Sequence, residues 1–139
     1  MELASHATLL SAIVTVLAML FYLYTGLRVG SARAKYKIDA PAITGDPNFE
    51  RVYRVQVNTL EHIVMFIPAL WLATIYFRQI GWLPAALGLV WIFGRILYMT
   101  GYIAAANKRS TGFLISGIAL LALFVLDIWG IVVAWGVSG

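Results

Sequence analysis

Four long apolar stretches constrain what this chain can fold into. They cover residues 7–27, 56–77, 82–106 and 113–136, approximately. Each is as long as the ~20 residues that an α-helix needs to cross a bilayer. Backbone polar groups inside lipid need partners within the protein, and a helix supplies a partner for each of them. The sequence therefore predicts an all-α integral membrane protein, with one domain over residues 1–139.

The connections and the composition support an antiparallel, up-down bundle of four helices. The second and third connections are short, as is usual between antiparallel neighbours. The chain is 62% hydrophobic and 12% charged, whereas soluble domains are about 45–50% apolar and about 25% charged. The first stretch has no basic region before it and is longer than the core of a signal peptide, so we expect a retained helix.

Residue counts exclude several kinds of site. The chain has no cysteine, which excludes disulfides and thiolate metal ligands. Its two histidines, His6 and His62, lie far apart and lack the spacing of a metal site. We therefore expect no metal, and no nucleic-acid partner. Any thiol chemistry would need a thiol carried by a ligand.

The basic residues predict the orientation in the membrane. Most lie in or beside the first and third loops, which share one face of the bundle: Arg28, Arg33, Lys35, Lys37, Arg51, Arg54, Lys108 and Arg109. Arg78 alone lies on the other side. Cytosolic loops carry an excess of lysine and arginine, so we expect loops 1 and 3 in the cytosol and both termini on the opposite side.

The second apolar stretch carries polar side chains in two directions. Arg54, Asn58 and Glu61 are spaced at i, i+4 and i+7, which places them on one face of a helix. His62 flanks that face, whereas Gln56 points well away from it. Taken alone, Asn58 and Gln56 could form hydrogen bonds between helices. Taken alone, His62 could be a core histidine whose hydrogen bonds are satisfied. Together they favour a helix that contacts both its own chain and another subunit.

The third stretch carries a longer polar set on one side, at i, i+4, i+7, i+11 and, if the helix persists, i+18: Trp91, Arg95, Tyr98, Tyr102 and Arg109. A charge at mid-membrane costs roughly 2.5–3.5 kcal/mol, so Arg95 should face the protein interior with a partner. Glu61 is the favoured acid and Asp127 the alternative. A buried structural pair would explain Arg95, and packing would explain the tyrosines.

The combined pattern predicts a cation-rich pocket at the cytosolic face. Arg33 and Arg54 could bind carboxylates through paired, charge-assisted hydrogen bonds. Glu61 could bind an amine, and the hydroxyls of Tyr98 and Tyr102 could donate along the pocket. A small zwitterion with carboxylates and an ammonium group suits such a site.

Several motifs resemble those of the MAPEG superfamily, the membrane-associated proteins of eicosanoid and glutathione metabolism. They are "SARAKYK", "PAITGDPNFERVYRVQVN", "GRILYMTGY" and "AANKRSTGF", which extend from about residue 29 to 113. Within the superfamily, the chain is most similar to the branch of microsomal glutathione transferase type two and leukotriene C synthase. The first and last apolar stretches are generic.

This resemblance implies a homotrimer that binds glutathione between adjacent subunits. The positions that match glutathione contacts of the family are Arg33, Arg54, Gln56, Asn58, Glu61, His62, Tyr98 and Tyr102. Arg109 matches the arginine that stabilises the glutathione thiolate, and Arg95 matches a further arginine. Two positions differ: His62 stands where tyrosine is usual, and Ala34 stands where leukotriene synthase has a second arginine.

The expected function is therefore glutathione transfer to a lipophilic electrophile that arrives through the bilayer, with peroxidase activity on lipid hydroperoxides as an extension. A guanidinium near the thiol, here Arg109, would lower the thiol pKa and enrich the thiolate. One alternative is a non-catalytic lipid-binding scaffold resembling the five-lipoxygenase-activating protein. A small multidrug transporter is disfavoured because the first helix has no acidic residue to couple protons.

Overall fold

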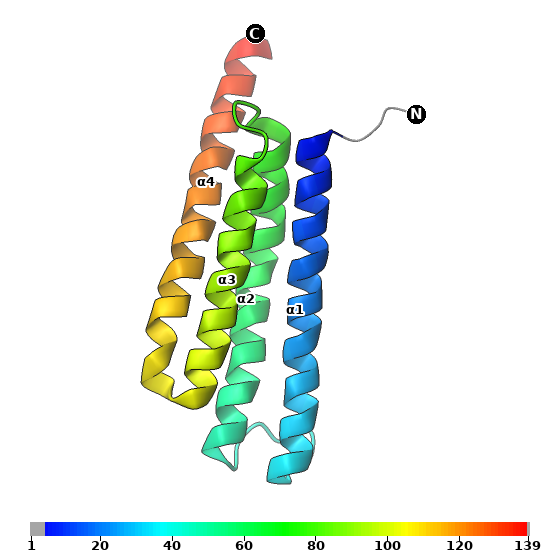
Figure 1. Cartoon of the computed structure of the whole chain (residues 1–139), viewed down its shortest axis with the longest axis vertical. Helices are drawn as coiled ribbons and strands as arrows, with labels where there is room; N and C mark the ends of the chain where they lie inside the picture. Colours follow the sequence, from blue (N-terminus) through cyan, green and yellow to red (C-terminus); the bar gives the residue numbers. More distant parts are fainter. Residues whose placement is uncertain (1–4, 139) are drawn as a thin grey trace.

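The protein is a bundle of four long helices (Figure 1), described for residues 5–138 by a computed structural model. The helices are α1 (His6–Tyr36), α2 (Pro47–Tyr76), α3 (Leu83–Ala104) and α4 (Ser110–Ser138), and the 3-10 helix η1 (Ala106–Arg109) joins α3 to α4. Each of the four long helices has the length and apolar composition to cross a membrane. The predicted all-α fold class is confirmed.

The helices extend beyond the apolar stretches because polar residues continue and cap them. α1 continues to Tyr36, where Lys37 ends it in a left-handed conformation with a φ of 56°. Asp46 begins α2 by accepting hydrogen bonds from two backbone N–H groups of the first turn. Pro47 is the first residue of α2. It occupies the first turn of α2, where an N–H has no partner within the helix.

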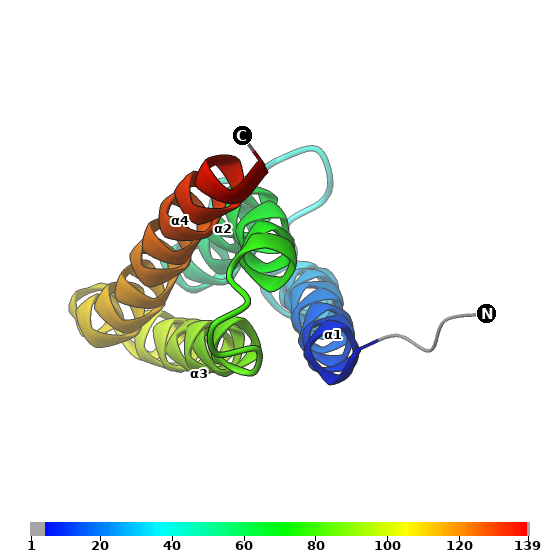
Figure 2. The ribbon, with the colours of Figure 1, turned by 90° about the horizontal axis from the view of Figure 1, so that it is seen from above.

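The two connections that carry most of the positive charge share one end of the bundle. The α1–α2 connection and η1 lie at the lower end in Figure 1, whereas α1 begins and α4 ends at the upper end. α2 contacts all three other long helices. Viewed along the bundle, α1 and α4 lie on opposite sides (Figure 2).

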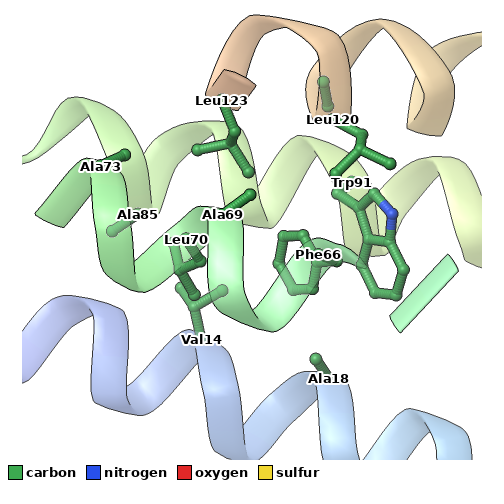
Figure 3. Close-up of a cluster of buried hydrophobic side chains, with 11 residues drawn as sticks. Val14, Ala18, Phe66, Ala69, Leu70, Ala73, Ala85, Trp91, Leu120 and Leu123 are labelled. Atoms are coloured by element: carbon green, nitrogen blue, oxygen red, sulfur yellow. The ribbon is translucent and has the colours of Figure 1, made fainter. Parts of the chain in front are cut away.

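A buried aromatic pair organises the centre of the bundle. The rings of Phe66 on α2 and Trp91 on α3 stack with centroids 4.0 Å apart and planes within 3°. Small and aliphatic side chains from all four helices pack around them (Figure 3). Arg95 follows Trp91 by one turn on the same face of α3, so this core layer fixes the side of α3 that faces α2.

Glycines allow α3 and α4 to approach each other closely. A Cβ added at Gly112 would lie 2.1 Å from the backbone nitrogen of Tyr98, and one added at Gly94 would lie 2.6 Å from the backbone nitrogen of Ser116. Neither position has room for a larger residue without movement of the helices. The close approach brings the start of α4 against the turn of α3 that carries Tyr98.

Candidate functional site

A partly polar cavity lies between α2, α3 and the start of α4, near the end of the bundle that holds η1. Its volume is about 500 Å³, within the range of roughly 300–1,000 Å³ that is usual for small-molecule sites. The side chains that line it are Arg54, Asn58, Tyr98, Arg109, Ser110, Phe113 and Leu114. The structure thus brings Arg54 and Asn58 of the second predicted helix together with Tyr98 of the third and with Arg109.

α2 presents polar groups in two directions, as predicted. Asn58 Nδ2 donates a hydrogen bond of 3.0 Å to Glu61 Oε2, beside the cavity. Gln56 lies on the side of α2 that faces α1, where its Nε2 would be 3.2 Å from a Cβ added at Gly26. Gln56 therefore does not reach the cavity of its own chain.

Tyr98 and Tyr102 form a pair beside Arg109. Their rings stack with centroids 5.6 Å apart. The Arg109 guanidinium lies 5.3 Å from the centroid of the Tyr102 ring, and Nη1 donates to the Tyr102 hydroxyl at 3.4 Å. Tyr102 itself lines a second hollow, of about 410 Å³, that shares Arg54 with the first.

Arg109 reaches this position because the helix that precedes it ends before Ala105. The helix does not persist to Arg109, which was the condition for placing it on the polar side of the third stretch, because α3 ends at Ala104 and Ala105 is extended, with φ −163° and ψ 141°. η1 then turns back over α3 at Gly101, where an added Cβ would lie 2.3 Å from the carbonyl oxygen of Lys108. Because glycine has no side chain at position 101, η1 can pack against α3 and hold Arg109 beside the tyrosines.

Arg95 is fully buried and has partners other than the predicted acids. Its Nη2 donates to the Thr59 hydroxyl at 2.8 Å, and its guanidinium lies 4.1 Å from the centroid of the Tyr98 ring. Among residues 5–138, neither Glu61 nor Asp127 forms an ion pair with it. Thr59 takes this place because it faces α3, whereas Glu61 follows two residues later on nearly the opposite face of α2.

Two further predicted contact residues lie away from the cavity. His62 is buried, with its ring edge-on to Phe113 at a centroid distance of 5.5 Å, so it stands behind the cavity lining. Arg33 Nη1 donates to the carbonyl oxygens of Ile38 and Ala42, at 3.3 and 2.8 Å. Arg33 therefore holds the α1–α2 connection and is not part of the cavity within one chain.

The remaining lining residues come from the first turns of α4 and were missed. They are Ser110, Phe113 and Leu114. The α4 stretch is apolar on all sides, so no periodic pattern distinguishes these positions from residues that face lipid. Their place directly after Arg109 was the one available signal.

The four membrane-length helices fit an integral membrane protein, and two arginines give its cavity a positively charged lining. The chain belongs to the MAPEG family, whose family model matches residues 11–129.

Several relatives carry names that describe an activity. Microsomal glutathione S-transferase 2 of Homo sapiens is 48% identical over 124 residues, which cover 89% of this chain and 82% of the relative. Leukotriene C4 synthase of Bos taurus is 39% identical over 122 residues, which cover 88% of this chain and 80% of the relative. An uncharacterized protein of Synechocystis is 48% identical over 114 residues, or 82% of each chain.

Proposed function

We propose that this protein is a membrane-bound glutathione transferase that joins glutathione to lipophilic electrophiles. The observation that carries the proposal is the cavity in which Arg54, Asn58, Tyr98 and Arg109 converge between membrane-length helices. The names of the relatives support the same activity. Glutathione supplies two carboxylates, one ammonium group and the thiol that a chain without cysteine lacks.

The polar groups of the cavity match the charges of glutathione. Arg54 can bind a carboxylate through two parallel hydrogen bonds. The Glu61 carboxylate, held by Asn58 at 3.0 Å, can accept from the ammonium group. The exposed Leu114 and the neighbouring Phe113 give the cavity an apolar side that meets the bilayer, which suits a lipophilic second substrate.

The residues that face away from the cavity suit an oligomer. Arg33 and Gln56 lie on the α1 side of the chain, and in the homotrimer that family resemblance implies they would complete the site of an adjacent subunit. We place loops 1 and 3, and hence the site, on the cytosolic side because these loops carry most of the positive charge.

Arg109 supplies the chemistry by stabilising the thiolate. A guanidinium close to a thiol lowers the thiol pKa from its usual value near 8.5, so more thiolate is present at neutral pH. The thiolate sulfur then forms a bond to the electrophilic carbon. The leaving group departs with the electron pair of the broken bond, and the thiol proton passes to solvent.

Replacement of Arg109 by alanine tests this role. We expect conjugation to fall by about 10²-fold or more, as when one anion-stabilising donor is removed from other enzymes, while the dissociation constant of glutathione changes only a few-fold. Lys108→Ala is the matched control, because it removes a neighbouring cation that does not line the cavity. Unchanged conjugation in Arg109→Ala would refute the role, and an equal loss of binding would make Arg109 a positioning residue.

A further inference from the structure

Two arginines and two tyrosines form a continuous column from the bundle interior to the cavity. The Arg95 guanidinium lies 4.1 Å from the Tyr98 ring centroid, Tyr98 stacks on Tyr102 at 5.6 Å, and Arg109 lies 5.3 Å from the Tyr102 ring centroid. The buried cation is thus two aromatic rings away from the arginine at the cavity. We call these four residues the Arg–Tyr column.

Arg95 forms no ion pair among residues 5–138, and the Glu61 carboxylate acts on its charge only through space. The side chain is 0% exposed. Its Nη2 donates to Thr59 and its guanidinium lies over the ring of Tyr98, whereas within residues 5–138 its Nε and Nη1 have no hydrogen-bond partner. Burial of an unpaired charge is costly, whereas a neutral side chain could bond to Thr59 and fill the same space. The positive charge itself therefore requires an explanation.

We propose that Arg95 is a positioning residue whose charge strengthens the Tyr98 hydroxyl as a hydrogen-bond donor to glutathione in the cavity. This inference rests on the proposed glutathione transferase function. A cation over an aromatic face attracts the electron density of the ring, which makes the phenolic O–H a stronger donor. In a low-dielectric interior the effect is weakly screened. Arg95 thus stabilises the bound thiolate through Tyr98, while Arg109 stabilises it directly from the cavity lining.

A purely structural role for Arg95 makes a different prediction. If Arg95 only fixed the register of α2 against α3, its replacement would lower thermal stability but leave the thiol of bound glutathione unchanged. A role through charge predicts a shift in the titration of that thiol. The two roles are therefore distinguished by the ultraviolet absorbance of the thiolate, measured as a function of pH.

The experiment compares the titration of bound glutathione in wild-type protein and in Arg95→Gln. Glutamine is neutral and can still donate to Thr59. We expect Arg95→Gln to bind glutathione and to raise the titration midpoint by about one pH unit, which is ~10-fold less thiolate at a fixed pH below the midpoint. Conjugation should recover at high pH. Thr59→Val is the matched control, because it removes the hydrogen bond and keeps the charge, and it should not move the midpoint.

Tyr98→Phe tests the same path without a change in the buried charge, and it keeps the proposal falsifiable if Arg95→Gln does not fold. It should raise the midpoint by a similar amount, and in the double variant with Arg95→Gln the two shifts should not add. An unmoved midpoint in either single variant overturns the proposal, as does an equal shift in Thr59→Val. The proposed transferase function fails separately, if wild-type protein shows no thiolate signal at all.

Discussion

The replacement of Gly101 by alanine tests whether activity depends on where the backbone holds Arg109. A Cβ at Gly101 would lie 2.3 Å from the carbonyl oxygen of Lys108, and ordinary contact begins at 3.4 Å. The carbonyl must therefore retreat by about 1.1 Å, because its partner is a backbone atom and not a flexible side chain. The adjacent Arg109 moves with it.

A displacement of this size has a predictable effect on catalysis. Misplacement of a catalytic group by ~1 Å can cost ~10²-fold in rate, which corresponds to about 2.7 kcal/mol in the activation free energy. The loss of folding stability should stay near 1 kcal/mol, the lower end for overpacked sites, because η1 is an exposed segment that can move.

The assay measures kcat/KM for the conjugation of glutathione to a chromogenic aryl halide, together with the thermal unfolding midpoint in detergent. Gly117→Ala is the control, since a Cβ there would have no neighbour within 4 Å. Gly101→Ala should lose about 10²-fold in kcat/KM, and Gly117→Ala should lose almost nothing. Equal activity of the two variants would refute the reasoning that η1 positions Arg109.

Three further predictions concern stability and the α1–α2 connection. Trp91→Ala should lower the free energy of unfolding by about 3–5 kcal/mol, measured by denaturant titration, whereas the 61% exposed Trp82 should tolerate the same change. Arg33→Ala should speed proteolysis in the α1–α2 connection, because two carbonyl groups lose their donor. Asp127→Asn should raise the thermal unfolding midpoint without loss of conjugation. The Asp127 Oδ1 atom has no hydrogen-bond partner among residues 5–138, and burial of a neutral amide costs less free energy than burial of a carboxylate. A lower midpoint would contradict it.

The fold could be predicted from the sequence because apolar length alone nearly determines it. Four stretches of membrane-spanning length leave few alternatives to a helical bundle. The ends of the helices could not be found in this way, since hydropathy detects the lipid-facing part of a helix and not its polar continuation. The nine residues of α1 from 28 to 36 and the first turns of α2 show this difference.

The site could be predicted one helix at a time, but contacts between helices could not. Periodicity placed Arg54 and Asn58 on one face, and the structure keeps them together in the cavity. It could not identify Thr59 as the partner of Arg95, because that depends on how α2 is rotated against α3. The position of Arg109 likewise depends on the end of α3 at Ala104 and the extended Ala105, which helical periodicity cannot predict.

The most direct test of the central proposal is the ultraviolet absorbance of purified protein on addition of glutathione at neutral pH. The proposal predicts a saturable thiolate signal that S-methylglutathione does not produce and that Arg109→Ala greatly reduces. Saturable binding of glutathione without any thiolate signal would contradict it, and would favour a non-catalytic binding protein.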